Sequence, residues 1–411
     1  MTSSFSNEKR NSFYSGVESF WPDLYGEEYA LYDIALEDKS EFEEIREASS
    51  NIGEILFKTN ELLRNLDDEN LAEMGFPKET IPFLRIKSNL RETTIARLDL
   101  ARTASGYKCL EINADTPTFI KECFFVNERV CTEFGVKDPN SGLEAKLAFA
   151  VRNSVQAAAA SVSAINPFVI FTAHGDNIED RETSIYLKEI SGLPSKFIPL
   201  DQLSIQRGVG LFDDQGVKID VLYRQTYPIE NLVKEQDDQG NPIGVWLLEL
   251  VLDGKLAIIN PMSAFLLQNK AVLAIVWNLH EEGSPFYTKL EHAWINKYFL
   301  PSYLEPDTFL QQGKKFVKKP VFGREGDTVE IFSSEGSLEL ADEQTSYTEH
   351  VSLYQEFAEL PVKRIQTEKG EQHGHILTGC FLIGGKPAAV GFRAGGLITN
   401  NLSYYLPVGL K

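Results

Sequence analysis

The stretch from residue 96 to residue 118, ARLDLARTASGYKCLEINADTPT, constrains the fold most, because it has the pattern of a β-hairpin with one polar face. Polar and apolar residues alternate through RLDL in its first half and through LEIN in its second half, with the period of a half-buried strand. The short connection at residues 104–106 ends in a glycine, which can take the positive φ of a tight turn. The stretch therefore predicts two antiparallel strands.

Four polar residues of this hairpin are predicted to lie together. A turn centred on Ser105 places Asp99 opposite Glu111. The same register places Arg97 opposite Asn113, so that all four side chains share one face. Two carboxylates and an amide are hard oxygen ligands, which suit Mg²⁺ better than zinc or copper. The solvated polar face of an ordinary hairpin is the alternative, and these residues alone leave both interpretations open.

The segment after the hairpin favours the metal site. Pro117 fixes a turn there, and the hydroxyl groups of Thr116 and Thr118 follow directly on the polar strand. If Asp99 and Glu111 hold Mg²⁺, their like charges repel each other when the metal is absent. Removing one of these charges is then expected to leave the stability of the nucleotide-free protein level or to raise it.

Length, charge and cysteine content limit the classes of partner. The 411 residues are too many for one small core and suit one large α/β unit or closely packed lobes. A net charge of −20 argues against nucleic acid or an anionic membrane as the partner. The four cysteines show no pair at metal-ligand spacing, and the N-terminus has no apolar segment typical of a signal peptide. We therefore expect a protein of the reducing cytoplasm.

Helix and strand patterns alternate along much of the chain. Residues 41–66 and 143–164 are predicted to be helices. Residues 167–172 and 218–223 are predicted to be buried strands. Four aromatic side chains near the N-terminus are expected in the core rather than in a site: Trp21, Tyr25, Tyr29 and Tyr32.

An acidic loop follows the first of these strands. Polar residues at the end of a buried strand are placed as in the ligand crevices of α/β proteins, which makes Glu179 and Asp180 candidate ligand contacts. A loop that only caps the next helix explains the same residues. Both interpretations stay open.

The last third of the chain contains two hairpin patterns suited to a nucleotide. Residues 316–322 and 327–332 alternate like strands around a turn, GREG, whose amides can fold over phosphates while Lys319 points at them. A second hairpin over residues 376–393 ends in Arg393 beside two glycines. An arginine at that place can clamp a phosphate, although many such arginines only form surface ion pairs.

Taken together, these motifs resemble the synthetase domain of the glutathionylspermidine synthase family. The resemblance rests on RLDL, LEINADTPT, LLQNKAVLAIVW, VKKPVFGREG, LYQE and VGFRAGGLITNNLS, which occur in the family's order. It implies an α/β (α+β) chain with a circularly permuted ATP-grasp-like fold and a preATP-grasp-type lobe. It also implies an N-terminal tail, residues 1–20, and one synthetase unit of closely joined lobes, residues 21–411.

The resemblance implies a role for each matching residue. The Mg²⁺ ligands would be Asp99, Glu111 and Asn113, and the catalytic arginines would be Arg97 and Arg393. Residues that bind ATP would be Lys270, Lys319, Gly323, Arg324, Gly326 and Gln355. Residues that bind the peptide and amine substrates would be Thr116, Thr118, Glu179, Asp180 and Arg224.

The function that the resemblance implies is ATP-dependent amide-bond formation. The enzyme would join a glutathione-like carboxylate to a polyamine-like amine through an acyl phosphate, releasing ADP and phosphate. The cysteine amidase found at the N-terminus of larger family members is not expected, because few residues precede the synthetase-like part. A nucleotide-binding protein without turnover and a kinase that stops at phosphoryl transfer are the alternatives. The substrates and the oligomeric state stay open.

Overall fold

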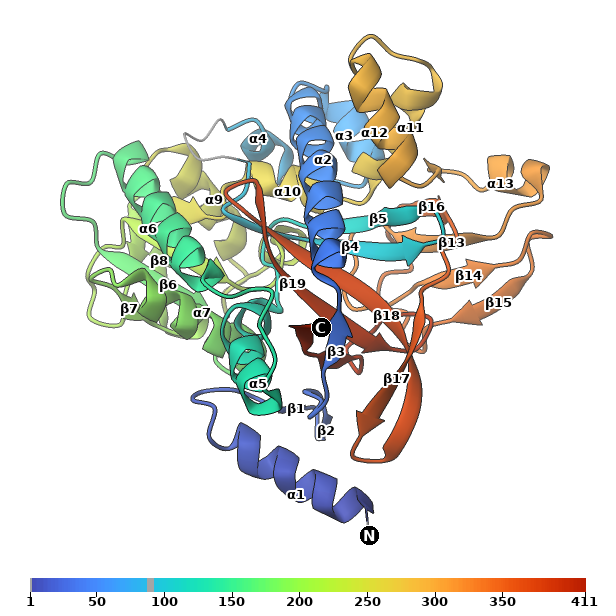
Figure 1. Ribbon diagram of the computed structural model, residues 1–411. Coiled ribbons are helices and arrows are strands. Elements are labelled where there is room, and N and C mark those ends of the chain that lie inside the picture. Colours follow the sequence, from blue (N-terminus) through green and yellow to red (C-terminus); the bar gives the residue numbers. More distant parts are fainter. Residues whose placement is uncertain (1, 87–91) are drawn as a thin grey trace.

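The computed structural model describes residues 2–86 and 92–411, with side chains described from residue 7 onward. Most strands belong to three sheets that lie side by side, with an antiparallel sheet in the middle (Figure 1). Helices cover these sheets, so the α/β class predicted from the sequence is confirmed. The circular permutation and the division into a tail and one unit stay predictions.

The middle sheet contains two of the hairpins predicted from the sequence. One carries the candidate metal ligands and is called the metal hairpin below, and the other is the C-terminal hairpin. Its strands are bonded in the order β20, β19, β18, β4 and β5, and β17 pairs with β18. Their bounds are Ile95–Thr103 for β4, Gly106–Asn113 for β5, Val362–Thr367 for β17, Gly370–Ile383 for β18, Lys386–Gly395 for β19 and Tyr404–Leu406 for β20. The long helix α2, Lys39–Leu63, lies across this sheet.

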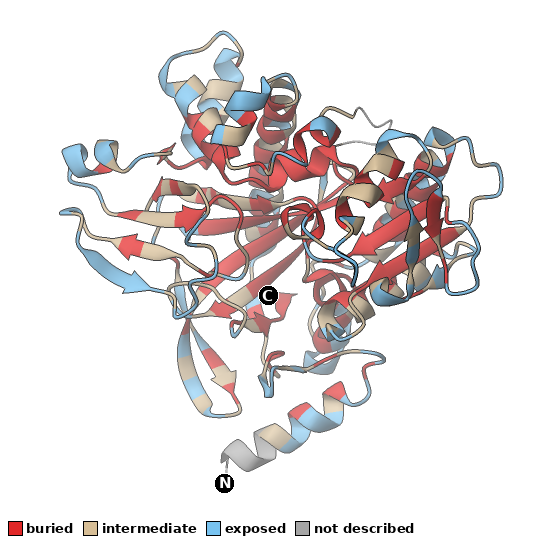
Figure 2. Ribbon diagram, turned by 180° about the vertical axis from the view of Figure 1, so that it is seen from behind, coloured by how far each residue is buried: buried red, intermediate tan, exposed pale blue. Residues whose placement is uncertain are grey.

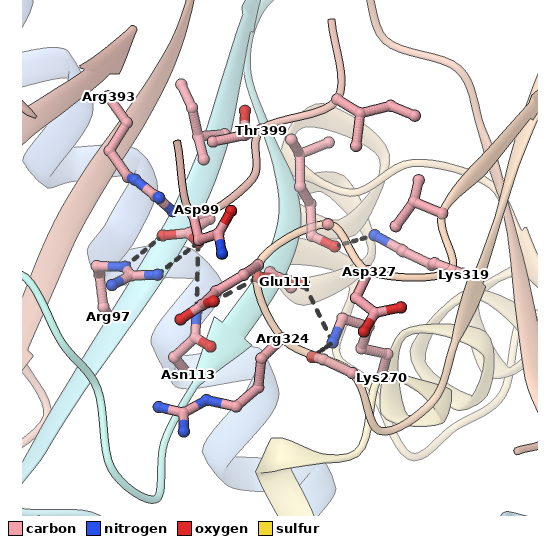
Figure 3. A pocket seen from close by; sticks show the side chains of 18 of the residues that line it. Arg97, Asp99, Glu111, Asn113, Lys270, Lys319, Arg324, Asp327, Arg393 and Thr399 are labelled. Atoms are coloured by element: carbon pink, nitrogen blue, oxygen red, sulfur yellow. Dashed lines mark hydrogen bonds and ion pairs between the residues drawn. The ribbon is translucent and has the colours of Figure 1, made fainter. Parts of the chain in front are cut away.

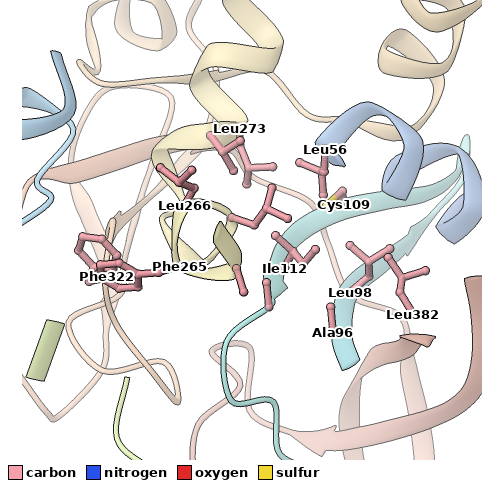
Figure 4. Close-up of a cluster of buried hydrophobic side chains, with 14 of the residues drawn as sticks. Leu56, Ala96, Leu98, Cys109, Ile112, Phe265, Leu266, Leu273, Phe322 and Leu382 are labelled. Atoms are coloured by element: carbon pink, nitrogen blue, oxygen red, sulfur yellow. The ribbon is translucent and has the colours of Figure 1, made fainter. Parts of the chain in front are cut away.

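The apolar face of the hairpin belongs to the main core (Figure 4). Leu98 of β4 and Ile112 of β5 join the same cluster as Leu56 of α2, and none of the three is more than 4% exposed. Because successive side chains of a strand point to opposite faces, the polar residues between them point away from this core. Burial of one face therefore decides which side chains the hairpin presents on the other.

A four-stranded parallel sheet lies on one side of the middle sheet. Its order is β11, β10, β6 and β7. The bounds are Val169–Ala173 for β6, Lys196–Phe197 for β7, Val221–Gln225 for β10 and Ala257–Ile259 for β11. Helices α6, Leu143–Ser161, and α7, Ile178–Ser191, pack on it. The predicted strands and the predicted helix of this region are confirmed.

A five-stranded antiparallel sheet lies on the other side. Its order is β12, β16, β13, β14 and β15. The bounds are Ser302–Tyr303 for β12, Phe316–Pro320 for β13, Glu330–Phe332 for β14, Leu338–Ala341 for β15 and Ser352–Glu356 for β16. Strand β14 begins later than predicted, because Asp327 and Thr328 form a turn. Thr328 has a φ of +64°, and the Asp327 carboxylate accepts a hydrogen bond from the Ser346 amide at 2.9 Å.

Shorter elements complete the chain. The other helices include α1 (Thr2–Tyr14), α3 (Asp68–Glu73), α4 (Ile81–Leu84), α5 (Asn127–Phe134), α8 (Ile229–Leu232), α9 (Ile243–Leu252), α10 (Ser263–Gln268), α11 (Ala271–Glu281), α12 (Lys289–Tyr298) and α13 (Asp307–Gln312). The other strands include β1 (Asp23–Leu24), β2 (Glu27–Glu28), β3 (Ala35–Glu37), β8 (Ser204–Gln206), β9 (Gly210–Phe212) and β21 (Val408–Leu410). Among the described helices, none has the length and apolar character needed to cross a bilayer.

Burial corrects one expectation about the N-terminal aromatic residues. Trp21 and Tyr29 are buried, as predicted for core side chains, and Tyr32 is half-buried against the same cluster. Tyr25 is 67% exposed, because it forms the tip of the hairpin between β1 and β2. Strands β6, β10 and β11 of the parallel sheet are buried along their whole length, whereas β15 is exposed along its length (Figure 2).

Candidate active site

One pocket collects side chains from the middle sheet, the five-stranded sheet and several loops (Figure 3). Strands β4, β5, β13, β16 and β19 contribute to its wall, together with the start of α7 and the loops at residues 323–327 and 397–401. The hairpin of β1 and β2 closes one side through Leu24 and Tyr25. Segments far apart in the sequence therefore meet at the polar face of the β4–β5 hairpin.

The register of this hairpin is the predicted one at the site. Asp99 lies opposite Glu111, and Arg97 lies opposite Asn113. Nearer the turn the register shifts, so that Thr103 pairs with Gly106 and the predicted centre on Ser105 is wrong.

A β-bulge reconciles the two registers. Leu100 pairs with Cys109 while Asp99 pairs with Glu111, which leaves Leu110 as the extra residue. Its carbonyl oxygen accepts a hydrogen bond from Nζ of Lys319 at 2.7 Å. The bulge therefore restores the polar alignment and also frees a carbonyl group for a lysine of another sheet.

Arginine and asparagine side chains tie the polar face together. Arg97 holds Asp99 with two bonds, Nε to Oδ1 at 2.7 Å and Nη2 to Oδ2 at 2.9 Å, and both residues are buried. Nη1 of Arg97 also donates to the Thr118 carbonyl at 3.0 Å. Nδ2 of Asn113 lies 3.2 Å from Oδ2 of Asp99 and 3.4 Å from Oε1 of Glu111.

The donor atoms of Asp99, Glu111 and Asn113 suit Mg²⁺ if the side-chain amide of Asn113 is flipped. As assigned, its NH₂ group bridges the two carboxylates, which is the place a cation between them would take. The nitrogen and oxygen of an amide have nearly the same shape, so a rotation exchanges them and presents a third oxygen. No group of three or more His, Cys, Asp or Glu side chains could hold a metal within residues 2–86 and 92–411. The fit therefore depends on this amide.

Two lysines lie close to Glu111 in the pocket. We call this group the lysine end: Glu111, Lys270, Lys319 and Gln355. Nζ of Lys270 lies 3.3 Å from Oε2 of Glu111 and donates to the Gly323 carbonyl at 2.8 Å. Nζ of Lys319 donates to Oε1 of Gln355 at 2.9 Å. Burial lowers the pKa of Lys319 to about 8, opposed by the nearby Glu111 carboxylate. Burial alone would raise the pKa of Glu111, but Lys270, Lys319 and Arg97 lower it to about 2.

A second group of lining residues consists of carboxylates and tyrosines, which we call the acid end: Tyr25, Tyr29, Glu179 and Glu325. Burial raises the pKa of Glu179 to about 8, and the charges of Glu122 and Asp180 add to this effect. Glu122 lies fully buried beneath Tyr29, whose hydroxyl group donates to its Oε1 at 2.6 Å. Burial also raises the pKa of Glu122.

The cap of α7 positions Glu179. Oδ1 of Asn177 accepts a hydrogen bond from the Asp180 amide at 3.0 Å, which starts the helix directly after β6. The acidic loop therefore caps the helix, as one interpretation of its sequence predicted, and Glu179 lines the pocket. A ligand contact by Glu179 stays a prediction.

Nearly all side chains predicted for the site line this pocket, and the exceptions are Asp180 and Arg224. Asp180 is buried and accepts a hydrogen bond from Nε2 of Gln225 at 3.3 Å. Arg224 is buried and forms an ion pair with Asp115. The structure therefore does not bring these two side chains to the lining, and the individual roles of the others stay predictions.

A protein-family model described as glutathionylspermidine synthase preATP-grasp matches residues 10–411. The chain belongs to this family. The resemblance inferred from the motifs is thereby confirmed.

Curated relatives from this family match part of their own length. Trypanothione synthetase of Crithidia fasciculata is 24% identical over 314 residues, which is 72% of this chain and 45% of the relative. The bifunctional glutathionylspermidine synthetase/amidase of Escherichia coli (strain K12) is 24% identical over 330 residues, which is 74% of this chain and 48% of the relative. The chain thus spans about half the length of the curated relatives it matches.

A solved structure shares the fold. The apo form of a glutathione synthetase-like effector from Globodera pallida matches 100% of this chain and 97% of its own, with a TM-score of 0.58 and 12% sequence identity. At this identity the likeness concerns the fold alone.

Several pocket residues lie outside the sites that the family motifs predicted. They include Tyr25, Gln268, Glu325, Asp327, Phe357 and Thr399. Gln268 stands two residues before Lys270, and its Oε1 accepts hydrogen bonds from the amides of Ala114 and Asp115 at 2.9 and 3.2 Å. That contact joins the segment that contains Lys270 to the end of β5. The one sequence signal for Tyr25 was its position before Gly26, since such a pair suits a two-residue turn.

Proposed function

We propose that the chain is an ATP-dependent carboxylate–amine ligase that forms an amide through an acyl phosphate and releases ADP and phosphate. The observation that carries the proposal is the meeting of two lysines, one from the start of α11 and one from β13, with a carboxylate pair. Lys270 lies 3.3 Å from Glu111, and Lys319 bonds the bulge beside it. Phosphoryl transfer needs positively charged groups around the phosphate, because negative charge spreads over several phosphate oxygens.

The lysine end binds the phosphates of ATP. In the ligand-free pocket Lys319 donates to neutral acceptors, the Leu110 carbonyl and the Gln355 amide oxygen. Phosphate oxygens carry negative charge and form stronger bonds with an ammonium group, so they can replace such partners. Asp99, Glu111 and Asn113 would hold Mg²⁺, which when bound supplies charge neutralisation at the transferring group.

Arginines orient the acid substrate. Arg97 is fixed by Asp99 and by the Thr118 carbonyl, so its guanidinium keeps one orientation beside the candidate metal ligands. It holds the carboxylate that attacks the terminal phosphate. Arg393, whose Nη2 donates to the Asn400 carbonyl at 2.7 Å, stabilises the charge that develops on the phosphoryl group.

The loops above the pocket keep water from the acyl phosphate. A Cβ atom at Gly326, which has a φ of +76°, would lie 2.6 Å from the Thr399 carbonyl oxygen. The loop at residues 323–327 therefore packs tightly on the loop at residues 397–401, and only glycine fits at this contact. Exclusion of water favours attack by the amine over hydrolysis.

The substrate classes follow from the relatives and from the acid end. A relative named glutathionylspermidine synthetase/amidase supports a glutathione-like acid and a polyamine-like amine. Hydroxyl groups of Thr116 and Thr118 line the pocket beside Arg97, where they can position the peptide part. The carboxylates of the acid end suit a cationic amine. A reducing cytoplasm remains the proposed location.

The proposal is tested by product analysis. The protein is incubated with Mg²⁺-ATP and each pair from a set of peptides and polyamines that includes glutathione and spermidine. We expect ADP release that requires both substrates, and mass spectrometry should detect the amide. A phosphorylated substrate without amide would indicate a kinase. ATP binding without ADP release for every pair would contradict ligase activity.

A further inference from the structure

The hairpin of β1 and β2 places an exposed tyrosine at the pocket. Residues 25–26 form its two-residue turn, with φ of +54° for Tyr25 and +80° for Gly26. Two positive φ values are typical of the turn that joins short antiparallel strands, where asparagine or glycine is usual at the first position. Tyr25 is 67% exposed and lines the pocket with Leu24.

The conformation of Tyr25 is unfavourable for its side chain. A left-handed φ brings Cβ of a non-glycine residue close to the following carbonyl group. Within the part of the chain that the structure describes, the Tyr25 hydroxyl forms no hydrogen bond, and the large exposed fraction shows little packing in return. Strained residues of this kind concentrate where ligands bind.

Buried Arg10 holds the base of this hairpin. Its Nη2 lies 2.7 Å from Oδ1 of Asp23, and its Nε lies 3.4 Å from Oε1 of Glu28. Nη1 reaches Glu368, beyond the end of β17, at 3.0 Å. Both strands of the hairpin are thus anchored to the same guanidinium group, which fixes where the tip points.

The tip faces a surplus of negative charge. Burial raises the pKa of Tyr25, and the charges of Glu325 and Glu179 add to this effect while Arg324 opposes it. Behind them Glu122 is fully buried, and its Oε2 has no hydrogen-bond partner in the described structure. Arg324 and Arg393 also act on this group, but the carboxylates outnumber them. Carboxylates in excess near an aromatic ring are the chemical match for an alkylammonium group.

We propose that Tyr25 is a specificity-determining residue whose ring covers the chain of an aliphatic amine while Glu179 and Glu325 meet its positive charge. The inference rests on the proposed function, because the amine is the second substrate of that reaction. It extends the substrate site to a segment outside the motifs on which the resemblance rests. An aromatic ring adds both apolar contact and attraction for a cation.

Calorimetry with spermidine as the probe tests the proposal, using protein saturated with Mg²⁺-ADP. Tyr25→Asn removes the ring but suits the left-handed φ, and Tyr25→Phe keeps the ring. Phe149→Ala is the matched control, because Phe149 is 60% exposed on α6 and lies outside the pocket lining. Loss of a cation contact with an aromatic ring should weaken spermidine binding about tenfold in Tyr25→Asn. Tyr25→Phe should stay within about twofold of wild type, and Phe149→Ala should match it.

The melting temperature separates recognition from a structural role. Asparagine relieves the backbone, so Tyr25→Asn should melt at the wild-type temperature or above while it loses spermidine affinity. Equal spermidine affinity in Tyr25→Asn and wild type would overturn the proposal, and so would an equal loss in Tyr25→Phe. Wild type that does not bind spermidine would also overturn it. Failure of the ligase function would appear instead as absent ADP release with spermidine binding intact.

Discussion

The two ends of the pocket use the same kind of acid in opposite ways. Glu111 at the lysine end has three basic side chains nearby, which outweigh its burial and lower its pKa to about 2. Glu179 at the acid end has other carboxylates nearby, and these add to its burial and raise its pKa to about 8. The partners, rather than the residue type, decide the charge state.

This difference suits the two binding tasks of the proposed reaction. At the lysine end the carboxylates are paired with bases, so an incoming anion would exchange partners with the lysines. At the acid end negative charge is in surplus, and protonation relieves it when no cation is present. A ligase that holds a nucleotide and an amine together needs both environments next to one another.

The largest expected effect concerns the metal hairpin beside the lysine end. Glu111→Gln and Asn113→Ala each remove a candidate Mg²⁺ ligand and should lower kcat roughly 10²–10³-fold. Glu330→Gln is the control, because Glu330 pairs at 2.8 Å with Lys318, outside the pocket. Rates of ADP release with and without Mg²⁺ measure the effect. Full activity of both pocket variants would contradict a Mg²⁺ site at this hairpin.

The structure reverses the stability that the sequence predicted for variants that lose one carboxylate charge. Asp99 is paired with buried Arg97, and Glu111 with Lys270, so neither carboxylate lacks a counter-charge. Removing one charge therefore leaves a base without its partner, and stability should fall rather than stay level or rise. Asn113→Ala keeps both ion pairs, which makes it the cleaner test of metal binding.

The second effect concerns ATP binding at the lysine end. Lys319→Met should weaken ATP binding by about 1.5–3 kcal/mol, the worth of a charged hydrogen bond. The protonated lysine binds phosphate, so wild-type affinity should fall as pH rises through about 8, the lowered pKa of Lys319. Lys319→Met should show less of this decrease. Calorimetry at pH 7 and pH 9 measures both expectations.

Lys318→Met is the matched control for this experiment. Lys318 is the neighbour of Lys319 on β13, and its side chain pairs with Glu330 rather than lining the pocket. Its loss should leave ATP affinity unchanged. Wild-type affinity in both Lys319→Met and Lys270→Met would show that the lysine end does not bind ATP.

The lysine end could largely be predicted from the sequence. Alternation through RLDL and LEIN decided the polar face, and Asp99 and Glu111 do face each other. The bulge at Leu110 could not be predicted, because it depends on packing and on a bond from Lys319, which stands far along the chain. Motif order supplied the two lysines, although only the tertiary structure brings them to one carboxylate.

The acid end was harder to predict. Its loop sequence suited a helix cap as well as a ligand contact, and Asn177 does cap α7. Tyr25 was expected in the core, because an aromatic residue among other aromatics is usually buried. Its exposure follows from a two-residue turn, and its place at the pocket follows from Arg10, which bonds segments distant in sequence. Long-range ion pairs leave no periodic signal.

The smallest effect concerns stability and tests the acid end directly. The pKa of Glu179 is about 8 in the folded protein and near its ordinary value of 4.5 in the unfolded chain. The folded state therefore keeps a proton that the unfolded state loses above pH 4.5. This contribution to the free energy of unfolding is complete below pH 4.5 and is lost as pH rises through about 8.

Glu179→Gln mimics the protonated acid at every pH. It should flatten the decrease between pH 5 and pH 9 and stabilise the protein by about 1 kcal/mol at the upper end of this range. Glu111→Gln should act in the opposite direction, because the lowered pKa of Glu111 contributes stability above pH 4.5 that is lost as pH falls toward 2. Thermal melting of both variants from about pH 3 to about pH 9 covers both pH windows and measures the two slopes. Identical slopes would mean that the two ends do not differ in charge state, and the division of the pocket into an anion site and a cation site would lose its electrostatic basis.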